Sequence, residues 1–181
     1  GIHYAGPDRW RTSLAAARHR TATQLAASTA GDRVLGAHCL DLCLHAHDLT
    51  TALGDPIDLA DHAPAALEAC RLVLDVAPRL LVAALGPREA TLRLVVHAPG
   101  ETHDRPGPAR QRAGAMERTV HVAGGRSAAA EPPGPAADTI EIDAGALLLL
   151  LAGRRRAEAL AGDGAMSWSG SAADAFVHRA R

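Results

Sequence analysis

Apolar residues in the first half of the chain recur every three or four positions, which is the period of an amphipathic helix. This spacing predicts helices over 7–27, from about Asp32 to Gly54, and over 64–85. The apolar stripe of the first helix comprises Trp10, Leu14, Ala17 and Leu25. The Asp32 side chain can cap the second helix, and Pro78 is expected to kink or split the third. An all-helical segment is therefore expected over residues 1–86.

In the second half the period changes to two, because residues 91–97 alternate apolar and polar as a half-buried strand does. Further strands are predicted at 117–123, 139–142 and 165–169, and helices at 143–151, 154–161 and 171–180. Residues 98–115 are expected to form a polar loop, and 124–137 a Gly, Pro and Ala-rich linker. The sequence thus predicts an α+β protein: a partial antiparallel helical bundle, then a small α+β domain over 87–181 with a mainly antiparallel sheet.

Composition removes several classes of function. The 181 residues are 48% hydrophobic but only 2% aromatic, so few rings are available to stack on bases. The net charge of -1 gives no long-range field that attracts nucleic acid. The longest apolar run, 146–152, is far too short to span a membrane. Three cysteines do not suggest a disulfide framework, so a cytoplasmic protein is expected.

Codon usage gives a hint of the source. All 19 basic residues are Arg, and the chain contains neither Lys nor Asn. A genome of very high G+C content produces this bias without any physical selection. We interpret it as pointing to an actinobacterium.

One helix holds a dense group of metal-ligand residue types. At 100° per residue, His38, Asp41, His45 and Asp48 fall within about 80° of one another. A carboxylate four residues before a histidine can place an oxygen and an imidazole nitrogen on one ion, and another carboxylate can orient that imidazole. A solvated polar face is the alternative interpretation. The leucines at 40, 42, 44 and 49 flank the group on several sides and favour a buried helix instead.

The residues from Asp41 to Gly54 read D-L-C-L-H-A-H-D-L-T-T-A-L-G. This stretch resembles E-x-x-x-H-x-x-D-L-x-x-A-x-G of the mycothiol-dependent maleylpyruvate isomerase family, which is DinB-like. The segments 138–143, 145–154 and 162–164 are similar to the sterol-carrier-like C-terminal domain of that family. The resemblance covers most of the chain from residue 8 onward. The two helices that come first in the family, with one of its metal-binding histidines, have no counterpart, so an incomplete bundle is expected.

The resemblance implies a function and a site. Asp41, where the family has Glu, and His45 would bind zinc or another divalent metal, with Asp48 and His38 as supporting residues. The metal would lower the pKa of a thiol such as that of mycothiol, and the thiolate would attack a small electrophilic carboxylate. Arg154 or Arg93 would hold the substrate carboxylate. The implied function is a metal-dependent thiol isomerase or transferase.

Two other classes of function remain open. The sterol-carrier-like half could enclose a small apolar or lipid-like molecule between its sheet and the helix at 147–151, without catalysis. Alternatively, a degenerate family member could act as an interaction partner. The open helical face would then pack against a second copy and form a homodimer.

If Asp41 and His45 are metal ligands, protein purified without a metal-affinity tag or chelator is expected to contain close to one zinc per chain. The His45→Ala variant should lose that zinc because it removes one of the two ligands. Plasma mass spectrometry of both proteins measures the stoichiometry. Zinc at background level in the parent protein would contradict this expectation.

Overall fold

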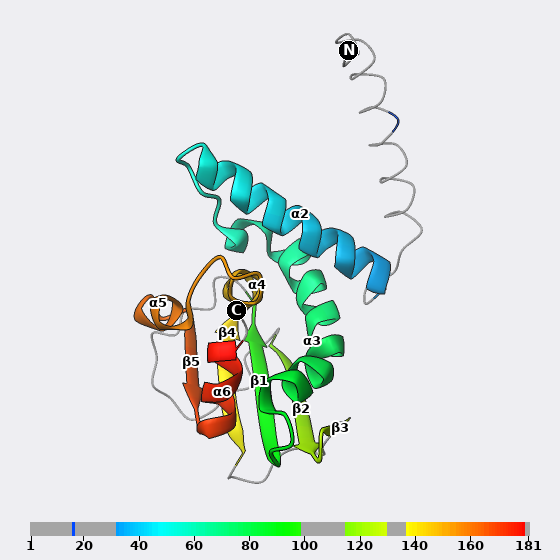
Figure 1. Ribbon diagram of the computed structural model, residues 1–181. Coiled ribbons are helices and arrows are strands. Elements are labelled where there is room, and N and C mark those ends of the chain that lie inside the picture. The colour runs from blue at the N-terminus through cyan, green and yellow to red at the C-terminus, as the bar shows by residue number, and fades with distance from the viewer. Residues whose placement is uncertain (1–15, 17–31, 99–114, 130–136, 180–181) are drawn as a thin grey trace, which may run out of the picture.

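The computed structural model describes residue 16, residues 32–98, 115–129 and 137–179 (Figure 1). The chain has the α+β fold expected from its sequence. The helix predicted over 7–27 lies outside the described residues except for Ala16, which is helical and exposed. Most of the loop predicted over 98–115 also lies outside them. Within the described ranges, no helix combines the length and apolar character needed to cross a bilayer.

The second predicted helix is confirmed as α2, Arg33–Ala52. The Asp32 carboxylate caps it by accepting hydrogen bonds from the backbone N–H groups of Val34 and Leu35, at 2.7 and 3.4 Å. The chain reverses at Gly54, whose φ of 81° favours glycine. Both helix ends are therefore set by residues that the sequence identifies.

The third predicted helix is α3, Ala63–Leu85, which follows the short 3-10 helix η1, Leu59–His62. It continues through Pro78 as one element, so the expected split does not occur. The ring of Pro78 removes one backbone donor, but burial of α3 against several elements outweighs that loss.

The described strands form one mixed sheet with the order β3-β2-β1-β4-β5. Strand β1, Ala90–His97, pairs antiparallel with β2, Met116–Ala123, and parallel with β4, Asp138–Asp143. The outer strands β3, Arg126–Ala129, and β5, Met166–Ser169, pair antiparallel with β2 and β4. Three of these four pairings are antiparallel, as expected, and the β1–β4 pairing makes the sheet mixed.

Strand β3 occupies part of the predicted linker 124–137, so that prediction is wrong for residues 126–129. Gly124 and Gly125 have φ values of 56° and 73°. Two successive left-handed residues form the two-residue turn that matches the twist of a β-hairpin. The turn brings Arg126–Ala129 back along β2, although these residues have little strand character of their own.

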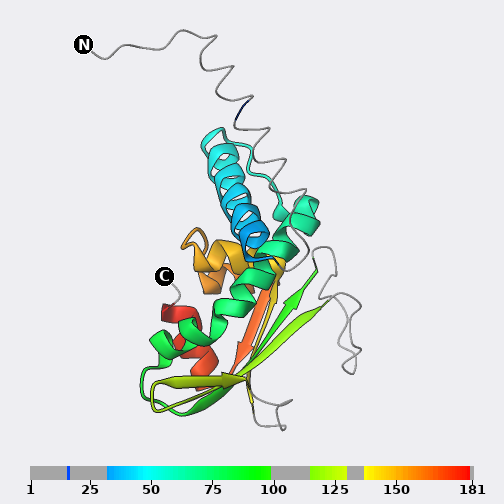
Figure 2. The same cartoon turned by 90° about the vertical axis from the view of Figure 1, so that its right-hand side faces the viewer.

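Three more helices complete the described chain: α4, Ala144–Leu151, α5, Ala157–Gly162, and α6, Ser171–Arg179. They confirm the predicted helices with small shifts of their ends. Figure 2 shows α3, α4 and α6 on the same side of the sheet, with α2 lying across α3 farther out.

The core lies between this side of the sheet and the helices. Leu94 of β1 is level with Ile140 of β4, and Val96 is level with Ile142, and all four side chains are buried. The same cluster extends through α3 to Cys43 of α2. Helix α3 therefore belongs to the helical segment by sequence but also packs on the sheet of the following segment. The boundary predicted at residue 86 stays a prediction.

Helices α2 and α3 approach closely at Gly36. A Cβ atom at this position would lie 2.8 Å from the Cβ of Leu72 and 3.2 Å from the carbonyl oxygen of Glu68. Both contacts are too short for a methyl group without movement of α2. The absence of a side chain at Gly36 therefore sets the spacing of the two helices.

The Gly36→Ala variant is expected to lower the free energy of unfolding by about 1–3 kcal/mol, because the methyl group pushes α2 away from α3. Gly162→Ala is the matched control, since Gly162 is also helical and nothing lies within 4 Å of its added Cβ. It should leave the free energy of unfolding unchanged or raise it by up to about 1 kcal/mol, because alanine is the better helix former. Urea titrations measure both, and equal effects would contradict the close approach at Gly36.

Candidate functional site

The predicted ligands Asp41 and His45 lie on the outward face of α2. The His45 Nε2 atom is 3.3 Å from Asp41 Oδ1, and the two side chains are 75% and 67% exposed. The helix thus brings the pair together as its spacing predicts. His38 lies one turn earlier on the same helix and is half-buried.

The described residues do not supply a complete metal site. No group of three or more His, Cys, Asp or Glu side chains in the described part of the chain comes together to hold an ion. Asp41 and His45 give two ligands, and a structural or catalytic zinc needs at least three from the protein. The described donor set therefore does not fit zinc, and the predicted metal site stays a prediction that needs a ligand from elsewhere.

Asp48 and Arg154, for which the sequence predicted separate roles, bind each other. The Nε and Nη2 atoms of Arg154 donate to the two carboxylate oxygens of Asp48 at 3.0 and 2.7 Å. The Nη1 atom donates to the carbonyl oxygen of Ala152 at 2.6 Å. The two-pronged pair ties the end of α2 to the loop after α4. To hold a substrate carboxylate, as the sequence predicted, Arg154 would have to release the Asp48 carboxylate.

Arg93 is engaged in the same way on the side of the sheet away from the helices. It donates from Nε and Nη2 to the two carboxylate oxygens of Glu117 at 2.7 and 2.8 Å. Hydrogen bonding from Arg93 lowers the pKa of Glu117. The roles predicted for Arg93 and Arg154 remain untested, but both guanidinium groups already hold a carboxylate of this chain.

The three cysteines are placed for packing. Cys43 and Cys70 are buried, and Cys39 is half-buried. Burial, with a smaller contribution from nearby Cys43, raises the pKa of the Cys70 thiol to about 12. Burial also raises the pKa of Cys39 and Cys43. A thiolate is the reactive form, so the raised pKa values disfavour nucleophilic chemistry at these positions.

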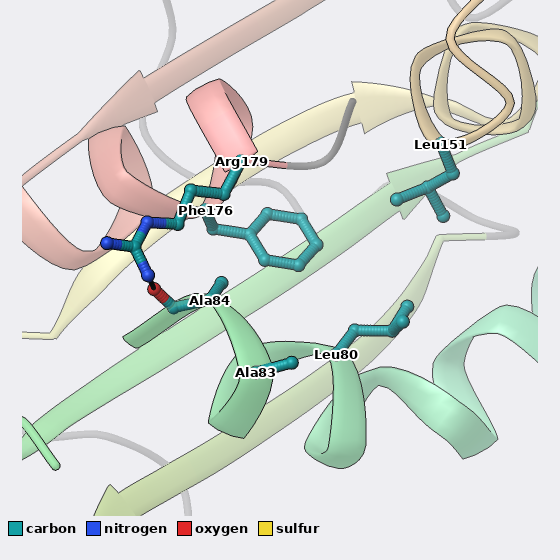
Figure 3. Close-up of a pocket in the computed structure, with 6 residues that line it drawn as sticks. All are labelled: Leu80, Ala83, Ala84, Leu151, Phe176 and Arg179. Carbon is teal, nitrogen blue, oxygen red and sulfur yellow. Dashed lines mark hydrogen bonds between the residues drawn. The ribbon is translucent and has the colours of Figure 1, made fainter. Parts of the chain in front are cut away.

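A cavity of about 310 Å³ opens between α3, α4 and α6. Its walls come from Leu80, Ala83, Ala84, Leu151, Phe176 and Arg179. Figure 3 shows the Phe176 ring facing the Leu151 and Leu80 side chains, with the Arg179 guanidinium on the other side of that ring, beside Ala84. The Nη1 atom of Arg179 donates to the carbonyl oxygen of Ala84 at 2.8 Å. An apolar wall with one cation can hold an apolar molecule that has an acidic group.

This cavity is not predicted by the sequence. Its residues come from three helices and lie up to 99 positions apart (179 minus 80) in the chain. Helical spacing places Leu80, Ala83 and Ala84 on one face of α3, and Phe176 and Arg179 on one face of α6, but no local pattern brings the three helices together. In the structure Leu80 is 37% exposed, on an otherwise well-buried helix.

The Asp48–Arg154 ion pair makes the stability of the fold depend on pH. Hydrogen bonds from Arg154 lower the pKa of Asp48 below its ordinary value of 3.8. The pair therefore stabilises the fold above pH 3.8, and this contribution is lost as the pH falls through the folded-state value.

The Asp48→Asn variant is expected to increase amide hydrogen exchange several-fold at the end of α2 at pH 7, because that end loses its tie to the α4 loop. Hydrogen exchange measured by mass spectrometry checks this. The double variant Asp48→Arg with Arg154→Asp should restore protection. Unchanged exchange in Asp48→Asn would show that the pair does not hold α2.

Comparison with known proteins adds little to this geometry. No protein-family model and no curated protein matches the chain. The chain is similar to the solution structure of a conserved hypothetical protein from Thermus thermophilus, whose suggested identity is a sterol carrier protein. The two share 22% identity over 60% of this chain and 78% of the other, with a TM-score of 0.31. At that TM-score, neither fold nor function is carried over, and the resemblance to the maleylpyruvate isomerase family stays a prediction.

Proposed function

We propose that this protein binds a small apolar molecule that carries a carboxylate, in the cavity between α3, α4 and α6. The observation that supports this function is the combination of an apolar wall with the Arg179 guanidinium at its side. The volume of about 310 Å³ lies at the small end of the range for small-molecule sites. A short acyl or aryl chain therefore suits it better than a large lipid.

The apolar wall supplies the binding energy. Leu80 is 37% exposed although it is a large apolar residue. Each Å² of apolar surface that a ligand removes from water contributes about 25 cal/mol to the free energy of binding. Phe176 is 3% exposed and its ring lies beside the Leu151 and Leu80 side chains, so a ligand would meet a wall that is already in place.

Arg179 supplies the selectivity for an acid. The bond to the Ala84 carbonyl uses one of the five N–H groups of the guanidinium and holds the side chain at the cavity. The remaining N–H groups can donate to a carboxylate, and a planar guanidinium matches its two oxygens. A neutral ligand of the same length would gain only the apolar contacts.

The cavity differs in position from the site expected between the sheet and α4. Leu147 and Leu148 of α4 are 1% and 0% exposed, so their side chains fill that space. Leu151, at the end of the same helix, is the α4 residue that lines the cavity. The ligand would therefore lie among the helices and not against the sheet.

A metal-dependent thiol isomerase or transferase is the second candidate function. It is supported by Asp41 and His45, whose side chains meet at 3.3 Å on one face of α2. The described residues give two ligands, and we derive no reaction step through a metal. Mycothiol as the thiol rests on the sequence resemblance alone.

Octanoate and octanol, which have equal chain lengths, test the binding proposal by thermal unfolding. At 100 times its dissociation constant, octanoate should stabilise the protein by about 2.7 kcal/mol, and octanol at the same concentration should stabilise it less. Arg179→Gln should reduce the octanoate effect to that of octanol. Ala83→Trp should abolish both effects because the indole fills the cavity.

Arg88→Gln is the matched control, since Arg88 is an exposed arginine outside the cavity lining. It should retain the full preference for octanoate. Stabilisation by octanoate that survives Ala83→Trp would place binding elsewhere. Equal stabilisation by octanoate and octanol in the parent protein would contradict the role of Arg179.

A further inference from the structure

A second cavity, of about 290 Å³, opens where the loop between α4 and α5 meets α6. It shares no lining residue with the cavity between α3, α4 and α6. Among the described residues, its lining includes two arginines and no acidic side chain. The lining comprises Leu150, Gly153, Arg155, Arg156, Ala157 and Val177. The second cavity therefore suits an anionic ligand.

The loop that carries the two arginines has a defined conformation. Gly153 ends α4 with a φ of 68°, which favours glycine. Its N–H group donates to the carbonyl oxygen of Leu150 at 3.0 Å, and the N–H group of Arg154 donates to that of Leu149 at 2.8 Å. These two bonds form the Schellman motif that closes a helix. The direction of the chain after α4, and with it the position of the next two residues, is thus set by the backbone.

The opposite wall of the second cavity is also held in place. Ala157 of α5 and Val177 of α6 line it, and each is followed in the chain by one member of a polar pair. In that pair the Nε2 atom of His178 lies 3.2 Å from Oε1 of Glu158. The contact joins α5 to α6. A ligand would therefore meet walls that need little rearrangement, which lowers the free-energy cost of binding.

Both arginines of the second cavity keep hydrogen-bond donors for a ligand. Arg155 donates from Nη2 to one carboxylate oxygen of Asp163. A guanidinium has five N–H groups, so the others remain. The Arg156 side chain is exposed, and its guanidinium makes no hydrogen bond or ion pair with another described residue. Since Asp163 and Glu158 already have partners, positive charge is left unbalanced at the cavity.

We propose that the second cavity binds the phosphate group of a small phosphorylated molecule. A phosphate monoester carries about −1.5 to −2 charges at pH 7 and three acceptor oxygens, so Arg155 and Arg156 can donate to it together. A carboxylate has one charge and two oxygens, which a single guanidinium satisfies. Leu150 and Val177 complete the lining and suit the organic part of the ligand. This proposal is independent of the proposed carboxylate site at Arg179.

Isothermal titration calorimetry of the full chain tests the proposal with phenyl phosphate, inorganic phosphate and benzoate. The ionic strength is kept constant because salt screens exposed charges. Phenyl phosphate is expected to bind more tightly than either of the other two. Arg156→Gln should weaken its binding about tenfold or more, because a charged donor is lost. This variant should fold normally, since its guanidinium holds no described residue in place.

Arg88→Gln is the matched control, because Arg88 is exposed and lies outside both cavity linings. It should bind phenyl phosphate as the parent protein does. Amide chemical shifts in the NMR spectrum locate the site, and those of residues 149–158 and of Val177 should change most. Arg179→Gln should leave phenyl phosphate binding unchanged, and Arg156→Gln should leave the octanoate effect unchanged.

The opposite results would overturn the proposal. Inorganic phosphate that binds as tightly as phenyl phosphate would mean that the organic part is not recognised. Benzoate that binds equally well would exclude selectivity for phosphate. Equal weakening by Arg88→Gln would mean attraction by diffuse surface charge. Loss of both ligands in Arg156→Gln or in Arg179→Gln would mean that a single site binds both, whereas loss of octanoate alone would leave the phosphate site standing.

Discussion

The burial of α3 on two sides is the constraint on which the rest of the structure depends. Its residues Ala69, Cys70 and Leu81 are almost completely buried, and they belong to a cluster that includes the sheet and reaches α2. Helix α3 thus covers the core of the sheet on one side and packs against α2 on the other. Its other neighbours, α4 and α6, meet it where the proposed ligand cavity opens.

The arginines show how charge is used in this fold. Arg93 and Arg154 each hold a carboxylate by two hydrogen bonds, and Arg179 holds a backbone carbonyl by one. A guanidinium that already binds two carboxylate oxygens is poorly available to a ligand, whereas one that binds a single carbonyl keeps further donors. This difference, more than charge or exposure, separates Arg179 from the two residues that the sequence suggested.

Local sequence signals predicted the described helices and most of the described strands. They did not predict contacts between residues that are distant in the chain. Asp32 and Gly54 mark the ends of α2 because capping and chain reversal depend on a few adjacent residues. The sequence also placed Asp41 and His45 on one helix face, since that follows from helical period alone. The short strand β3 and the Asp48–Arg154 pair were missed, because each depends on a partner distant in the chain or on a turn whose register has no local pattern.

Within the described residues, the sheet ends in two strands of only four residues each, β3 and β5. An exposed strand edge presents unpaired N–H and C=O groups on which another chain can add a strand. Four residues offer few such groups, so growth of the sheet by a foreign strand is weakly favoured at either edge. The described part of the sheet is therefore a poor template for the edge-to-edge stacking that starts β-aggregation.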